Sequence, residues 1–276
     1  MASMSSVVAR KTAFCVLILA AILLAGCVTA PLTGRRQLML VSSAQEMQLG
    51  ADAYKEVLSK EKEVPNHGSA AVLRRVGLRI AGVANQPSFQ WEFRLIASDQ
   101  VNAWALPGGK IAFYTGILPY LKNEAGMAAV MAHEVGHAIA RHGAERMSQQ
   151  IVAGVGLEVL KYGMKDAKPE TREAMLGLYG VGTNVAVLLP YSRKQEYEAD
   201  HIGLILMAKA GYDPEEAVRF WQDMVARGKP SGFDLLSTHP ADEKRIAELK
   251  KLMPEAKAEY AKAANKYGAG VVLPLK

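Results

Sequence analysis

Apolar residues recur at helical spacing through most of the chain, which is the pattern of amphipathic or buried helices. A shorter central region instead alternates apolar and polar positions, which is typical of strands. Helices are predicted over 42–59, 69–83, 123–141, 144–162, 171–189, 193–210, from 213 onward and from 240 to 253. Strands are predicted over 91–97, 101–106 and 110–114, the last two joined by a Pro107-Gly108-Gly109 turn. The pattern predicts a predominantly helical α+β fold with a small sheet.

Local signals support several of these helix starts. Ser42 stands three residues before Gln45, the spacing of a capping box. Asp213 and Pro214 provide a cap and a proline at the first helical position. Pro240 marks another start, which would place His239 close to the N-cap.

The two helical patterns over 144–190 are unusually apolar, with no charged residue from Ala174 to Tyr191. Three glycines and Asn184 interrupt this stretch, which argues against a membrane span. We therefore expect a hairpin buried in the protein.

The N-terminus has the pattern of a signal peptide. Arg10 and Lys11 precede an apolar run over 12–25 that is too short to span a bilayer comfortably. The run ends in Leu-Ala-Gly-Cys27, which resembles the lipobox of bacterial lipoproteins, whose cysteine accepts diacylglycerol. The alternative is an ordinary signal peptide or a short membrane anchor with a buried cysteine.

These observations divide the chain into four parts. We expect a signal peptide over 1–26, a lipidated tether over 27–41, one folded domain over 42–253 and a C-terminal tail over 254–276. Cys15 lies in the removed segment, so Cys27 is the only cysteine left and no internal disulfide can form. Val28 follows the cysteine where an aspartate would favour retention in the inner membrane. The expected location is therefore the outer membrane, facing the periplasm.

Charge and composition exclude one class of partner. Half of the residues are hydrophobic and 22% are charged, which is ordinary for a globular protein. The net charge of +6 falls to +4 (6 − 2) when Arg10 and Lys11 leave with the signal peptide. The remaining basic residues form no block, so nucleic acid is not expected as a partner.

One motif in the predicted helix 123–141 has the spacing of a metal site. His133 and His137 stand at i and i+4, so both imidazoles lie on one helix face and can reach one tetrahedral zinc. Glu134, beside the first histidine, can accept a proton from a metal-bound water. The alternative is a helix with two partly exposed histidines that make local contacts.

A catalytic zinc needs a third protein ligand. An extended H-E-x-x-H-x-x-G-x-x-H motif is excluded, because position 143 is glycine. His142 is rotated about 140° around the helix from His137 and is expected to point elsewhere.

Glu196 is the better candidate for the third ligand. Asp200 shares its face and can accept the N–H of a ligand histidine. Glu198 should point about 200° away and be dispensable. The alternative for Glu196 and Asp200 is a solvated acidic face.

Together these motifs resemble the gluzincins, which combine H-E-x-x-H with E-x-x-x-D on a later helix. Three further segments resemble the branch that includes the CAAX prenyl protease, HtpX, BepA and LoiP: Asn102-Ala103 with Pro107-Gly108-Gly109, Ser192-Arg193 to Gly203, and Ser237-Thr238-His239-Pro240. The segment Thr33-Gly34-Arg35-Arg36-Gln37 resembles the mature start of the bacterial lipoproteins in this branch. The similarity spans about residues 31–250.

The resemblance implies a zincin-like metallopeptidase domain with its sheet packed on the zinc-binding helix, and one Zn²⁺ per chain. It implies that His133, His137 and Glu196 are the ligands, that Glu134 is the general base and that Asp200 orients His133. The expected function is endoproteolysis of unfolded or misassembled cell-envelope proteins. The alternatives are a lipid-anchored chaperone or assembly factor with little proteolysis, and a zinc hydrolase acting on cell-wall peptide.

Two further sites follow from the same interpretation. In zinc peptidases an edge strand receives the substrate backbone, so Asn102 and Ala103 are candidate substrate-binding residues. An ordinary hairpin strand is an equal alternative. His239 is expected near the zinc, either as an oxyanion donor or as a fourth ligand that blocks water until the loop 230–238 moves. The third alternative is a cap residue on the surface.

Overall fold

The computed structural model describes residues 27–165, 167–183, 193–227 and 234–274. The predicted signal peptide, the end of the predicted helix 171–189 and residues 228–233 lie outside this part. In the described part the chain is predominantly helical with small sheets, which confirms the predicted fold class. Its principal helices are α2 (Ser43–Lys60), α3 (Gly68–Val83), α5 (Glu124–Ile139), α6 (His142–Gly163), α7 (Pro169–Thr183), α8 (Arg193–Lys209), α9 (Glu215–Arg227) and α11 (Glu243–Lys262). The shorter helices are the 3₁₀ helix η1 (Thr115–Ile117), α4 (Leu118–Leu121) and α10 (Asp234–Thr238).

The central sheet has three strands, β3 (Glu92–Ile96), β4 (Ala103–Leu106) and β5 (Lys110–Tyr114), in the order β3-β5-β4. β4 and β5 form the predicted hairpin, in register from Ala103↔Phe113 to Leu106↔Lys110. Gly108 and Gly109 turn it with φ of 84° each, a backbone region that favours glycine. β3 is parallel to β5 and lies on its other side, so β4 is an edge strand.

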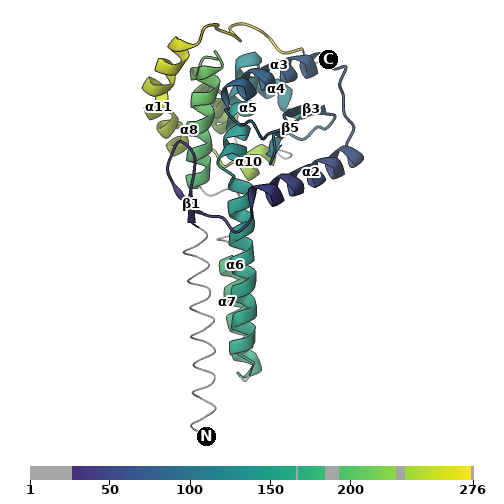
Figure 1. Ribbon diagram of the computed structural model, residues 1–276, viewed down its shortest axis with the longest axis vertical. Helices are drawn as coiled ribbons and strands as arrows, with labels where there is room; N and C mark the ends of the chain where they lie inside the picture. Colours follow the sequence, from purple (N-terminus) through teal and green to yellow (C-terminus); the bar gives the residue numbers. More distant parts are fainter. Residues whose placement is uncertain (1–26, 166, 184–192, 228–233, 275–276) are drawn as a thin grey trace.

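Helix α5 lies at the centre of the molecule, and every one of its residues is buried. The sheet and α3 cover one side of it, while α8 lies along the other and is itself covered by α11 (Figure 1). α2 packs across the opposite face of the sheet, where Val57 and Trp104 contact Ile96, Ala112 and Tyr114. Its N-terminus has the predicted capping box between Ser42 and Gln45.

Two glycines let α5 and α8 approach each other closely. A Cβ on Gly136 would lie 2.6 Å from the carbonyl oxygen of Ala199, and one on Gly203 would lie 2.9 Å from the backbone of Ala132. Any side chain at either position would therefore force the two helices apart. This contact brings the histidine face of α5 against the carboxylate face of α8.

The segment predicted as a tether is folded against the domain. Strands β1 (Cys27–Thr29) and β2 (Arg36–Leu38) form an antiparallel hairpin, which we call the N-terminal hairpin. Gln37 is buried, and Arg35 forms ion pairs with Glu145 of α6 and Glu198 of α8. Buried polar contacts, which were not visible in the pattern of the segment, hold it in place.

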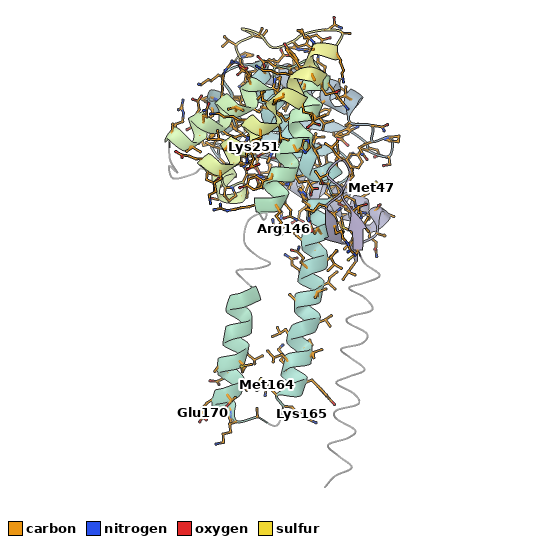
Figure 2. All side chains as sticks on the ribbon, turned by 90° about the vertical axis from the view of Figure 1, so that its left-hand side faces the viewer. Met47, Arg146, Met164, Lys165, Glu170 and Lys251 are labelled. Atoms are coloured by element: carbon orange, nitrogen blue, oxygen red, sulfur yellow. The ribbon has the colours of Figure 1, made fainter. Side chains whose placement is uncertain are left out.

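The prediction of a buried hairpin over 144–190 is wrong for the described residues. Helices α6 and α7 extend together away from the domain, with Met164, Lys165 and Glu170 at the far end (Figures 1 and 2). Only the first turns of α6 contact the domain, and Ile151, Val155, Val159 and Tyr162 are between 43% and 61% exposed. Among the described residues, no third element covers the outer faces of these two helices. No helix in the described ranges is long and apolar enough to span a membrane.

The C-terminal region also differs from its prediction. The last helix begins at Glu243 with Asp242 as its N-cap, so His239 is not at a helix start. It continues through Pro254 to Lys262 rather than ending near Met253. The residues after it pack back on the domain, where the amide of Glu124 donates to Val271 O (2.9 Å) and Leu273 is buried. The predicted tail is therefore part of the same folded unit.

The close approach of α5 and α8 generates a stability prediction. Gly203→Ala should destabilise the protein by about 1–3 kcal/mol, because the added methyl group must displace backbone. Thermal unfolding measures this as a fall of about 2–4 °C for each kcal/mol. Gly143→Ala is the matched control, since its Cβ meets nothing within 4 Å and alanine favours a helix. Equal melting temperatures for Gly203→Ala and the wild type would contradict the packing argument.

Candidate active site

Four buried side chains meet at one place in the structure. Two come from α5, one comes from α8, and the fourth belongs to the residue that follows α10. Ligand atoms of His133, His137, Glu196 and His239 all lie within 4.8 Å of one another. His133 Nε2 lies 3.1 Å from His137 Nε2 and 3.2 Å from His239 Nδ1. Glu196 Oε1 lies 3.4 Å from His137 Nε2 and 3.2 Å from His239 Nδ1. The three residues predicted as ligands are therefore together, and His239 is beside them.

The protonation of His137 and Glu196 suits a bound cation, whereas that of His133 opposes it. Burial lowers the pKa of His137 well below its usual value, so this ring keeps a lone pair. Burial opposes ionisation of Glu196, but the charge of Arg245 and the nearby histidines outweigh it and hold the pKa well below normal. For His133, burial and Arg245 favour the neutral ring, but Asp200 and Glu196 raise the pKa to about 9. A metal would have to displace that proton.

Two buried oxygen atoms in the site have no hydrogen-bond partner, Glu134 Oε1 and Glu196 Oε2. Glu196 Oε2 lies 2.9 Å from Arg245 Nη1, in an ion pair without the alignment of a hydrogen bond. Unsatisfied buried oxygens are rare, and a bound metal or water is one of the groups that satisfies them. The donor set of imidazoles and one carboxylate matches the preference of zinc. The residues present therefore fit a zinc ion.

Glu134 lies beside this cluster on α5. Its Oε1 is 3.4 Å from His239 Nε2, and burial raises the pKa of the carboxyl group. The backbone of Ala105, on the edge strand β4, hydrogen-bonds to Glu134 and partly offsets this effect. A carboxylate with a raised pKa in this position is suited to proton transfer.

Asp200 is in the predicted position beside His133. Its Oδ1 lies 2.9 Å from His133 Nδ1, which leaves Nε2 facing the cluster. This is the arrangement by which an outer carboxylate orients a ligand histidine.

Arg245 is a residue of this site that the sequence interpretation missed. Its Nε and Nη2 donate to the two oxygens of Asp200 (2.5 and 2.8 Å), and its guanidinium stacks 3.7 Å from the ring centre of Trp221. It is only 1% exposed and compensates Glu196 and Asp200, two of the three buried carboxylates of α8. The sequence held no signal for this, because an arginine in the first turns of a polar helix is usually solvent-exposed.

The expectation for the direction of His142 is wrong. His142 does not point away from the site: its Nδ1 lies 2.8 Å from Nδ1 of His137. Its Nε2 lies 2.9 Å from Glu198 Oε2, and Glu198, which was expected to be dispensable, is buried in this contact. Arg141 has a left-handed backbone with φ of 58°, so α5 ends before it and α6 begins after it in a new direction. The angle of about 140° between His137 and His142 assumed one continuous helix and therefore does not apply.

The candidate substrate-binding residues lie at the start of β4. Asn102 accepts the N–H of Ala103 on its own Oδ1 (2.9 Å), and its carbonyl accepts from Tyr114 N (3.1 Å). Ladder bonds alternate along an antiparallel strand, so the main-chain groups of Ala103 and Ala105 face away from β5. This edge of the sheet, which pairs with no other strand among the described residues, thus passes Glu134 at Ala105.

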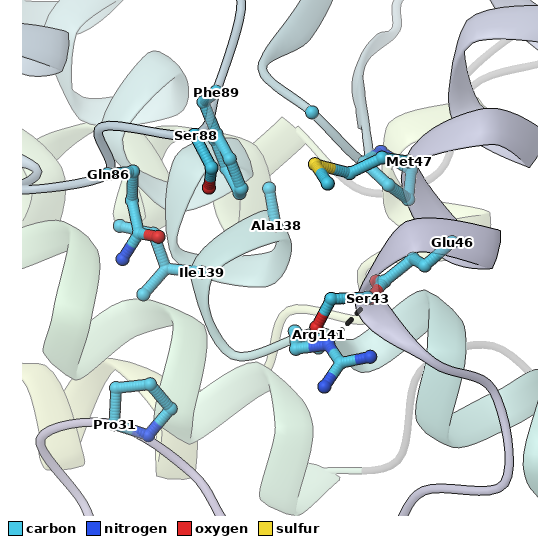
Figure 3. Close-up of a pocket in the computed structure, with 12 residues that line it drawn as sticks. Pro31, Ser43, Glu46, Met47, Gln86, Ser88, Phe89, Ala138, Ile139 and Arg141 are labelled. Carbon is cyan, nitrogen blue, oxygen red and sulfur yellow. Dashed lines mark hydrogen bonds and ion pairs between the residues drawn. The ribbon is translucent and has the colours of Figure 1, made fainter.

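A separate pocket of about 180 Å³ lies one turn beyond His137, at the C-terminal end of α5. Figure 3 shows it between Met47 of α2, Phe89, Ala138 and Ile139, with Arg141 bonded to Glu46 at one side. None of the four clustered side chains lines it. It adjoins Pro107, where the edge strand ends, and is not the metal site.

Comparison with known proteins agrees with this geometry. The sequence model of peptidase family M48 matches residues 68–253, about two thirds of the chain. The chain belongs to peptidase family M48. The mitochondrial metalloendopeptidase OMA1 of Schizosaccharomyces pombe is 37% identical over 234 residues, which cover 83% of this chain and 67% of that protein.

Two other relatives of this M48 peptidase are also named as proteolytic enzymes, one as a metalloendopeptidase and one as a protease. OMA1 of Saccharomyces cerevisiae is 30% identical, covering 84% of this chain and 70% of its own. The beta-barrel assembly-enhancing protease of Escherichia coli is 28% identical, covering 80% of this chain and 46% of its own. This M48 peptidase is therefore a zinc-dependent metalloendopeptidase that acts on proteins or peptides, as predicted.

Proposed function

We propose that His133, His137 and Glu196 hold the zinc ion of an endopeptidase and that Glu134 is its general base. The observation that supports this most strongly is the buried cluster of three imidazoles and one ionised carboxylate beside the unpartnered Glu134 Oε1. A lipid-anchored chaperone with a purely structural metal site would have no need for a buried carboxylate there. A vestigial metal site would not need this carboxylate either. Burying a carboxylate costs free energy, so an inactive protein could lose Glu134 without losing a function.

Bound zinc supplies a Lewis acid that polarises the scissile carbonyl and makes water acidic near neutral pH. Glu134 takes the proton of the attacking water and later gives it to the leaving amine. The raised pKa of its buried carboxyl group makes Glu134 a stronger base for taking this proton. Asp200 holds His133 by Nδ1, and Arg245 holds Asp200 in turn.

The substrate backbone pairs with the free edge of β4 as an added strand. Main-chain groups of Ala103 and Ala105 face this edge, and Asn102 begins it. Because the backbone of Ala105 also reaches Glu134, a peptide on this edge is held beside the base. This pairing recognises main chain rather than side chains, which suits extended, unfolded proteins.

His239 is a gate in this proposal. Its Nδ1 is within 3.2 Å of both His133 Nε2 and Glu196 Oε1, the position of a fourth ligand. A fourth protein ligand closes a zinc site to water.

α10 would have to move for His239 to leave the site. Part of the loop expected to move, 234–238, forms this helix, and the remainder lies outside the described residues. The amide of Leu235 donates to Val101 O (3.0 Å), directly before the edge strand. Opening would therefore break a contact next to the substrate edge.

The cellular setting is also part of the proposal. A lipid on Cys27 anchors the enzyme to the outer membrane, facing the periplasm, and its substrates are unfolded or misassembled envelope proteins. Cys27 is exposed at the start of β1, and the sequence before it resembles a lipobox. One relative is named a beta-barrel assembly-enhancing protease, which supports an envelope role, whereas others are named as mitochondrial.

Glu134→Gln should abolish cleavage of casein while zinc content stays near one per chain. The amide keeps the shape of the carboxylate but cannot accept the proton. The same variant should retain bound proteins in cells, which identifies the substrates. Chelator-sensitive cleavage at the wild-type rate would remove Glu134 as the base. Its matched control is Glu170→Gln, an exposed residue at the far end of α7.

His239→Ala should raise basal cleavage and autolysis, because removing the fourth ligand opens the site to water. Zinc should remain bound by the other three residues. A fall in rate of about a hundredfold would contradict the gate and support an oxyanion role for His239. An unchanged rate would exclude both roles.

Cys27→Ser should block lipidation and the processing of the signal peptide. A chain that begins at Val28 behind an ordinary cleavable signal should be soluble and active. If that chain stays on the membrane, the exposed apolar face of α6 is the anchor instead of the lipid.

A further inference from the structure

We propose that His142 and Glu198 are positioning residues that fix which nitrogen of His137 is available to the metal. The inference rests on the proposed ligand set, since it concerns His137 as a ligand. It starts from a row of contacts leading out of the site: His137 Nδ1 to His142 Nδ1 (2.8 Å), then His142 Nε2 to Glu198 Oε2 (2.9 Å).

Glu198, at the end of this row farthest from the cluster, determines which atom donates in each hydrogen bond. Glu198 is held by Arg35, whose Nε donates to Oε2 (2.7 Å), and by the hydroxyl group of Thr33. An ionised carboxylate paired with arginine can only accept hydrogen bonds. Nε2 of His142 must therefore carry the hydrogen of that ring.

The position of the hydrogen on His142 then determines the hydrogen bond between His142 and His137. A neutral His142 with hydrogen on Nε2 has its lone pair on Nδ1, so this atom must accept from His137 Nδ1–H. His137 then carries its hydrogen on Nδ1 and its lone pair on Nε2. Nε2 is the nitrogen that faces His133 Nε2 (3.1 Å) and Glu196 Oε1 (3.4 Å). The contacts of His142 with Glu198 and His137 thus place the lone pair of His137 on Nε2, the nitrogen that faces the cluster.

The N-terminal hairpin completes this arrangement. Arg35 also makes two hydrogen bonds of 2.7 Å to Glu145, so it holds α6 and α8 together. Glu145 in turn accepts from Gln195, one residue before the proposed ligand Glu196 (2.7 Å). Residues that follow the anchored cysteine therefore support the metal site through His142.

The test compares two variants of similar shape. His142→Asn places an amide oxygen where Nδ1 stands and can still accept from His137, whereas His142→Leu cannot. Zinc affinity, measured by competition with a chromogenic chelator, should fall about 10–100-fold in His142→Leu. It should stay within about threefold of the wild type in His142→Asn, since an acceptor remains. His201→Leu, whose ring contacts Glu255 of α11 rather than the cluster, is the control and should bind zinc like the wild type.

Equal affinities for the Asn and Leu variants would overturn the proposal. If the Leu variant does not fold, ¹⁵N-histidine NMR of the zinc-loaded wild type provides the answer. The expected tautomers are Nδ1–H for His137 and Nε2–H for His142, and the opposite tautomer at His142 would overturn the proposal. Failure of the ligand set itself is distinguishable, because His137→Ala would then bind zinc normally.

Discussion

The close contact between α5 and α8 is the constraint on which the rest of the molecule depends. A glutamate side chain is short, so Glu196 can join two histidines of another helix only if the two backbones nearly touch. Gly136 and Gly203 permit that approach, one on each helix. Both glycines lie between or beside the functional residues of their helices, so the surface that packs the core is also the surface that builds the site. Stability and chemistry therefore rest on the same contact.

Burying so many ionisable groups requires compensation, and it comes from both ends of the chain. Arg245 of the C-terminal helix neutralises Asp200 and Glu196 behind His133. Arg35 of the N-terminal hairpin neutralises Glu145 and Glu198 behind His137. An uncompensated buried charge is strongly destabilising, so neither arginine can be lost without consequence. The N-terminal hairpin and α11 are therefore part of the catalytic domain rather than extensions of it.

Features with a fixed local spacing could be predicted from the sequence. The i, i+4 pairs on two helices follow from helical geometry, and Pro107-Gly108-Gly109 follows from turn chemistry. The capping box at Ser42 was visible for the same reason.

Features that depend on the neighbours of an element could not be predicted. Glu198 was placed correctly on the far side of α8 from Glu196, but that side is covered by α6 and the N-terminal hairpin instead of water. His142 was misplaced because a left-handed residue, Arg141, breaks the helix before it. The apolar pattern of α6 and α7 predicted burial, yet apolarity alone does not supply a partner to pack against.

The central claim is that one zinc ion lies among His133, His137, Glu196 and His239. Crystals of the zinc-loaded protein, measured on both sides of the zinc absorption edge, test it directly. We expect one anomalous peak per chain, about 2.0–2.1 Å from a nitrogen of each histidine and about 2.0–2.2 Å from a Glu196 oxygen. A peak elsewhere, or one that Glu196 does not contact, would contradict it.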